Sequence, residues 1–90
     1  MKQVRAVYKG HVQGVGFRFT VMHLSHGVNI SGYVKNAPDG SVELVAEGAE
    51  SDLKEFLKKI QGSLLGGHIR DCIESWSDAS GIYSSFGIQY

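Results

Sequence analysis

The chain has 90 residues, a formal net charge of zero and one cysteine, so it is long enough for one domain, residues 1–90, and cannot form an internal disulfide. Neutral charge argues against nucleic acid as the main partner, because that binding depends on many contacts to phosphates. No apolar run approaches the roughly 20 residues that cross a bilayer, and the N-terminus lacks a secretion signal, so we expect a cytoplasmic protein with no membrane partner.

The first third of the chain predicts a strand followed by a helix. Apolar residues alternate with mostly polar ones over residues 2–10, which is the pattern of a strand with a buried face. Apolar residues then recur at helical spacing, at Phe17, Val21, Leu24 and Val28, which predicts a short helix. Gly27 follows where such a helix could end in a left-handed cap.

Two further alternating segments, residues 29–36 and 41–47, predict a pair of strands. Between them, Pro38 presets a turn dihedral and Gly40 can supply a positive one. The pair should therefore form an antiparallel hairpin, with Asn36 ending a strand at its mouth.

The second half of the chain predicts a helix and two strands. Ser51 can cap a helix that Gly62 stops, and its apolar stripe is Leu53, Phe56, Leu57 and Ile60. Residues 66–76 predict a strand with a bulge, because their apolar residues break strict alternation, and residues 86–90 alternate again. The order βαββαββ predicts an α+β, ferredoxin-like sandwich with two helices on one face of a mostly antiparallel sheet.

The loop between the first strand and the first helix is rich in glycine. A helix N-terminus favours an anion, and Gly14 and Gly16 permit positive φ values that turn backbone N–H groups inward as a concave nest. The planar guanidinium of Arg18 can donate hydrogen bonds to two oxygens of a phosphate at once. The spacing excludes the common nucleotide-binding loops. From these residues alone, the alternative to an anion-binding loop is a tight strand-to-helix turn in which Arg18 is exposed to solvent.

Two segments together resemble the paired signatures of the acylphosphatase family, and the resemblance extends over essentially the whole chain. They are Gly10-His11-Val12-Gln13-Gly14-Val15-Gly16-Phe17-Arg18 and Gly32-Tyr33-Val34-Lys35-Asn36-Ala37-Pro38-Asp39-Gly40-Ser41-Val42-Glu43. Residues 62–68 lack the glycine-proline step often seen in the family, which leaves the shape of that loop open. The family's fold is the ferredoxin-like sandwich derived above.

The resemblance implies a hydrolase that splits the carboxyl–phosphate bond of acyl phosphates into a carboxylate and inorganic phosphate, without metal or cofactor. We expect it to be a monomer. Arg18 matches the family's phosphate-binding arginine, and Asn36 matches the asparagine that positions the attacking water. The phosphate cradle would comprise Arg18 with the backbone amides of Gln13, Gly14, Val15, Gly16 and Phe17. Such a sparse site suits a carboxylate leaving group, which departs without a proton.

Three alternatives remain from the residues. His11 could serve as a base, although the resemblance implies that the substrate's own phosphate accepts the proton. Asn36 could simply bond its own turn. The protein could instead be a binding module, either an RNA-recognition domain, because Gly16-Phe17-Arg18-Phe19 is similar to its glycine-aromatic signature, or an acyl-phosphate-binding part of a larger enzyme.

Overall fold

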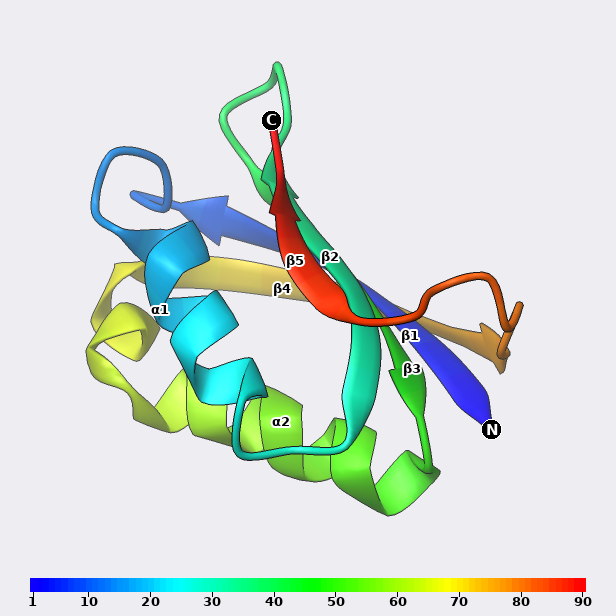
Figure 1. Ribbon diagram of the computed structural model, residues 1–90. Coiled ribbons are helices and arrows are strands. Elements are labelled where there is room, and N and C mark those ends of the chain that lie inside the picture. Colours follow the sequence, from blue (N-terminus) through cyan, green and yellow to red (C-terminus); the bar gives the residue numbers. More distant parts are fainter.

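The computed structural model describes residues 1–90 and contains a five-stranded sheet and two α-helices (Figure 1). The elements are, in chain order, β1 (Lys2–Gly10), α1 (Phe17–Ser25), β2 (Ile30–Asn36), β3 (Val42–Gly48), α2 (Glu50–Gly62), the 3-10 helix η1 (Leu64–His68), β4 (Ile69–Asp78) and β5 (Phe86–Gln89). No helix is long and apolar enough to span a membrane.

The strands lie in the order β4-β1-β3-β2-β5, and all neighbours are antiparallel except β2 and β5. Both α-helices cover the same face of this sheet (Figure 1). The predicted ferredoxin-like α+β sandwich is confirmed. The predicted hairpin is also confirmed, because β2 and β3 pair antiparallel from Asn36 with Val42 to Ile30 with Gly48.

The core lies between the helices and the covered face of the sheet. It is a cluster of 14 buried residues, most of which β1, β2 and β3 supply from one side and the two α-helices from the other; Val12 and Leu65 complete it. On β1, Val4, Ala6 and Tyr8 alternate into it, and α2 contributes Leu53, Phe56 and Ile60. The periodicities that predicted these elements therefore arise from burial on one side.

The predicted helix ends need two corrections. Helix α1 ends at Ser25 with His26 as its cap, and Gly27 does not adopt a positive φ, so the left-handed cap is wrong. Helix α2 begins at Glu50 with Ala49 as its cap, so Ser51 lies inside the first turn and caps nothing. Acidic Glu50 and Asp52 favour this earlier start, because negative charge stabilises a helix N-terminus.

The predicted strand of residues 66–76 starts too early, because residues 66–68 belong to a 3-10 helix and β4 begins at Ile69, but its predicted bulge is present. Residues Leu64–His68 form η1, whose first turn is capped by the Ser63 hydroxyl accepting from the Leu65 N–H. In β4, Ile69 pairs with Gly10 and Asp71 with Lys9, so the strand carries one extra residue there. The bulge lies inside the predicted segment, and its extra residue, Arg70, explains the break in alternation between Ile69 and Cys72.

Candidate active site

Four segments that are far apart in the sequence meet at one end of the sheet. They are the loop after β1, the first turn of α1, the end of β2 and the residue that follows β5; Figure 1 shows these segments toward the top of the molecule. A cavity of about 180 Å³ opens there. Its lining consists of Val12, Gly14, Gly16, Phe17, Arg18, Phe19 and Asn36. The structure thus brings Arg18 and Asn36 into one cavity with the glycine loop.

Gly14 and Gly16 give the loop its shape. Their φ values are +77° and +76°, in the left-handed region that other residues adopt at a cost. Gly16 is also the N-cap of α1, and no side chain bonds the free amides of that helix end. The positive end of the helix dipole therefore faces the cavity without a protein anion to neutralise it.

The backbone N–H groups from Gln13 to Arg18 have no hydrogen-bond partner within the protein. The nearest paired backbone donors on either side are His11, which bonds the His68 carbonyl, and Thr20 of α1, which bonds the Gly16 carbonyl. Backbone donors are almost always paired with protein, water or ligand. A run of open donors at a helix start is a site where an anion can be held.

The side chain of Gln13 ties this loop to the β2–β3 hairpin, a role that the sequence did not indicate. Its Nε2 donates to the carbonyl oxygens of Ala37 at 2.8 Å and Ser41 at 2.9 Å. Only the backbone amide of Gln13 was predicted to matter. The side chain instead fixes the distance between the loop and the hairpin mouth at which Asn36 lies.

Arg18 lies in the first turn of α1 and forms no ion pair with any carboxylate. Its guanidinium carbon is 5.0 Å from the centroid of the Tyr90 ring, which is a cation–π contact. Such stacking covers the flat face of the guanidinium and leaves the N–H groups on its edge able to donate.

Asn36 ends β2 on the same face of the sheet as buried Val34, which is the face that the helices cover. The turn beside it is closed without its side chain. The Asp39 carboxylate accepts from the Ser41 N–H at 3.0 Å and from the Ser41 hydroxyl at 2.6 Å, and these bonds lower the pKa of Asp39. Asp39 thereby fills the turn-bonding role considered for Asn36, whose amide instead lines the cavity.

Val15 and the histidines lie outside the lining of the cavity. Val15 packs against the core cluster, so only its backbone is available to the loop. His11 lies beside His68, with ring centroids 5.8 Å apart, and neither lines the cavity; His23 and His26 pair with each other near the far end of α1.

Cys72 is placed away from the loop, on β4 opposite Tyr8. Burial raises the pKa of its thiol, and the nearby Glu74 carboxylate raises it further. A thiol that holds its proton is a poor nucleophile, so the environment of Cys72 does not activate it.

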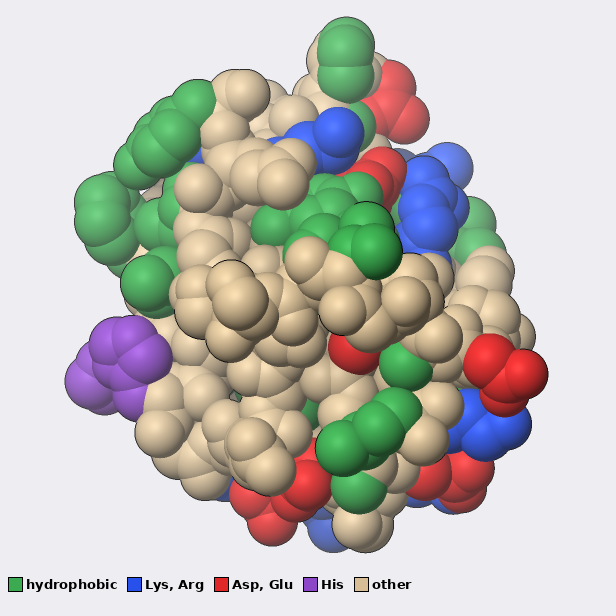
Figure 2. Space-filling view, turned by 45° about the vertical axis from the view of Figure 1, so that its right-hand side comes forward, with side chains coloured by type: hydrophobic (Ala, Val, Ile, Leu, Met, Phe, Trp, Pro, Cys, Tyr) green, Lys and Arg blue, Asp and Glu red, His purple; other side chains and the backbone are tan.

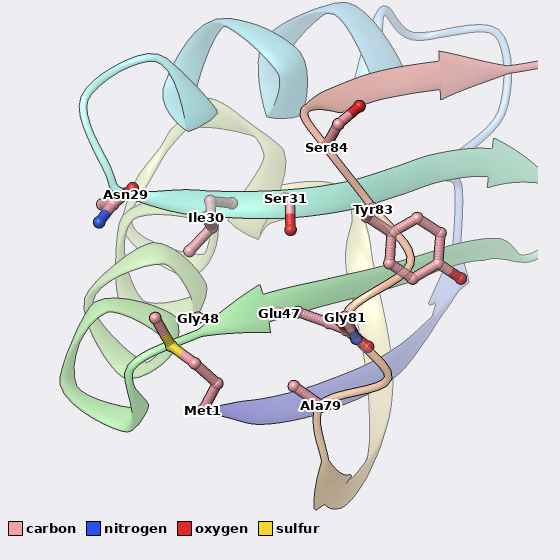
Figure 3. A pocket seen from close by; sticks show the side chains of 10 residues that line it. All are labelled: Met1, Asn29, Ile30, Ser31, Glu47, Gly48, Ala79, Gly81, Tyr83 and Ser84. Carbon is pink, nitrogen blue, oxygen red and sulfur yellow. Dashed lines mark hydrogen bonds between the residues drawn. The ribbon is translucent and has the colours of Figure 1, made fainter.

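A second cavity, of about 260 Å³, lies at the opposite end of β2 (Figure 3). Buried Glu47 forms part of its wall and accepts hydrogen bonds from the Gln3 amide, the Ser80 N–H and hydroxyl and the Gly81 N–H, at 2.6 to 3.0 Å. Burial alone would raise the pKa of Glu47, but these bonds lower it to about 2. The carboxylate thus anchors the segment before β5.

The fold and the site together define a small α+β sandwich protein with a cationic, amide-lined cavity at one end of its sheet. The model of one family, acylphosphatase, matches residues 4–88. The chain therefore belongs to the acylphosphatase family.

Individual relatives agree with this assignment. An acylphosphatase of Caldanaerobacter subterraneus is 40% identical over 87 residues, which is 97% of each chain, and one of Bacillus licheniformis is 40% identical over 91 residues, which is 100% of each. The crystal structure of acylphosphatase from Bacillus subtilis superimposes with a TM-score of 0.91 at 34% identity and covers all of both chains. The chain also matches 12% of T. kodakarensis HypF, at 31% identity and a TM-score of 0.84.

Proposed function

We infer that this protein is an acylphosphatase, a hydrolase that acts on the anhydride bond between a carboxyl group and a phosphate. Its products are a carboxylate and inorganic phosphate. The family match over residues 4–88, together with full-length relatives that are acylphosphatases, carries this conclusion.

We propose that the phosphate of the substrate is held by Arg18 and by the backbone N–H groups of Gln13, Gly14, Val15, Gly16 and Phe17. Those donors are unpaired within the protein and lie at the start of α1. Phosphoryl transfer through a loose transition state is catalysed mainly by positioning and by stabilising charge on the equatorial oxygens. A fixed set of amides and a guanidinium fork supply both, and they need no reorganisation during the reaction.

Asn36 is proposed to position the attacking water. Its amide carries an acceptor oxygen and two donor hydrogens, so it can accept a hydrogen from water and hold the oxygen lone pair toward phosphorus. Its place in the lining with Arg18 supports this role, and so does the Asp39 side chain, which leaves Asn36 free of the turn.

The proposed reaction needs neither a protein acid nor a protein base. The leaving group is a carboxylate, which is stable without a proton, and the phosphate oxygens of the substrate can accept the proton of water. His11 lies beside His68 and outside the cavity lining, which supports leaving it out of the mechanism. We propose that the enzyme uses no metal and no organic cofactor, and that it works in the cytoplasm as a monomer.

The RNA-binding alternative is disfavoured by where its aromatic and basic residues lie. Phe17 is 2% exposed and packs on Tyr8 with ring centroids 5.2 Å apart, so it cannot stack on a base. On the uncovered face of the sheet, Glu43 accepts from the Tyr33 hydroxyl at 2.5 Å and pairs with Arg5 at 2.9 Å. These groups satisfy one another, whereas RNA-binding sheets present free aromatic faces.

The decisive experiment is an assay of the purified protein on acetyl phosphate and benzoyl phosphate, with a chelator present and release of inorganic phosphate as the readout. We expect turnover of both substrates. Protein that is folded by circular dichroism yet inert toward both, while it retards RNA at low salt, would overturn the assignment.

A further inference from the structure

Two of the few large apolar side chains on the surface lie at the proposed phosphate site. Phe19 is 71% exposed and Tyr90 is 94% exposed. Phe19 lines the cavity, and the Tyr90 ring lies over Arg18. Figure 2 shows apolar side chains at the surface of the upper end of the molecule, close to Lys and Arg side chains. Exposed aromatic side chains beside a binding cavity indicate contact with a ligand.

The local structure explains why Phe19 points outward. In α1, Phe17 and Val21 are the buried positions that face the core. A residue midway between them lies on the opposite side of the helix, because successive residues turn by about 100°. Phe19 therefore projects away from the core, at a position where amphipathic helices normally carry a polar residue.

Tyr90 reaches the same place from the sheet. Strand β5 runs parallel to β2, with Gln89 beside Lys35 and Ile88 beside Val34. Ile88 packs against the core from the covered face. Tyr90 continues on that face, past the end of β5 and over the start of α1, where its ring stacks on the Arg18 guanidinium.

The interior of the cavity is closed by apolar side chains, so the acyl group of a substrate must extend outward. Val12 is 1% exposed and Phe17 is 2% exposed, and both belong to the packed core. With its phosphate on the loop amides and Arg18, an acyl phosphate can direct its organic part only toward the mouth. Phe19 and Tyr90 are the aromatic side chains at that mouth.

We propose that Phe19 and Tyr90 form the subsite for the acyl group, and that this subsite favours acyl phosphates with a flat or bulky apolar acyl group over acetyl phosphate. The proposal rests on the proposed acylphosphatase function. An aromatic acyl group would lie against the exposed ring of Phe19, with the Tyr90 ring beside it in contact with Arg18. Acetyl phosphate offers one methyl group for the same contact, so it gains much less from apolar burial.

The test compares kcat/KM for benzoyl phosphate and acetyl phosphate in the wild type, Phe19→Ala, Phe19→Leu and Tyr90→Ala. We expect the benzoyl-to-acetyl ratio to fall about tenfold in Phe19→Ala and several-fold in Tyr90→Ala, from lost apolar and aromatic contact. Phe19→Leu should restore part of the ratio. The matched control is Leu64→Ala, because Leu64 is 94% exposed on η1 and does not line the cavity; it should leave both substrates unchanged.

The outcomes separate this proposal from the function on which it rests. A wild type inert toward both substrates contradicts the function itself. The subsite is overturned, and the function stands, if the wild type hydrolyses both substrates and Phe19→Ala leaves the benzoyl-to-acetyl ratio unchanged. An equal fall in kcat/KM for both substrates is the same outcome. Unchanged thermal unfolding of Phe19→Ala would show that a lowered ratio does not come from a damaged fold.

Discussion

At the scale of single residues, Arg18 has the most direct proposed role. Arg18→Ala should lower kcat/KM for acetyl phosphate at least about a hundredfold, because removing one transition-state donor costs about 3 kcal/mol or more. The kcat/KM of Arg18→Lys should lie between those of the wild type and Arg18→Ala, since lysine keeps the charge but lacks the planar, two-pronged set of donors of the guanidinium. Steady-state kinetics measure both variants. Arg18→Ala within a few-fold of wild type would contradict the proposed cradle.

Asn36 should behave differently from Arg18, because its proposed partner is water. Asn36→Ala should lower kcat strongly and leave the affinity for phosphate nearly unchanged, since an interaction made with the nucleophile acts on the chemical step. The inhibition constant of inorganic phosphate measures that affinity. A variant that loses phosphate binding and kcat in proportion would assign Asn36 to the cradle instead.

Gln13 offers a test of how the loop and the hairpin are held together. Gln13→Glu replaces the amide that donates to the Ala37 and Ser41 carbonyls with a carboxylate that cannot donate. We expect a lower melting temperature and a kcat/KM reduced for every acyl phosphate, because the loop and Asn36 lose their fixed separation. Gln13→Ala is the milder control, since it removes the bonds without adding a charge. A Gln13→Glu variant with wild-type kinetics would refute the coupling.

At the scale of elements, the segment that leads into β5 depends on one carboxylate. Hydrogen bonds hold the pKa of Glu47 at about 2, below its usual 4.5. A lowered pKa in the folded state means that the stabilisation is complete above about pH 5 and is lost as the pH falls toward 2. Glu47→Gln should therefore be less stable than wild type at pH 7, by about 2 kcal/mol for hydrogen bonds to a charged group.

Denaturant unfolding at several pH values measures this effect. The difference between wild type and Glu47→Gln should shrink as the pH is lowered toward 2, because the wild-type carboxyl then gains its proton. Glu55→Gln is a suitable control, since Glu55 is exposed and pairs only with Lys59 on the surface of α2. A stability difference that is the same at pH 7 and near pH 2 would mean that the charge of Glu47 does not matter.

Local patterns predicted most of the elements because each strand and helix is buried on one side. The alternation of Val4, Ala6 and Tyr8 and the Pro38-to-Gly40 turn are such signals, and the structure follows them. The helix caps were less predictable, since Ser51 and Gly27 carry the right chemistry at positions where the chain does not use it. Caps depend on where neighbouring elements end, and the residue types alone do not encode that.

At the scale of the whole molecule, the sequence predicted the sandwich and brought Arg18 and Asn36 into one hypothesis through a family resemblance. It did not predict the Gln13 side-chain bridge or the Tyr90 ring over Arg18. Both join segments far apart in the chain, and the second depends on β5 pairing parallel with β2. Such contacts follow from strand order, for which a single sequence carries little local signal.

The left-handed backbone at Gly16 makes the loop sensitive to the chirality of the residue at that position. At Gly16, an added Cβ would meet no atom within 4 Å, so only the φ of +76° opposes a side chain there. L-alanine should cost about 1 to 2 kcal/mol, whereas D-alanine adopts that φ without strain and should cost less. A chemically synthesised chain with D-alanine at position 16 should remain active and melt higher than its L-alanine counterpart. Equal melting temperatures for the two mirror-image residues would mean that this backbone geometry is not required.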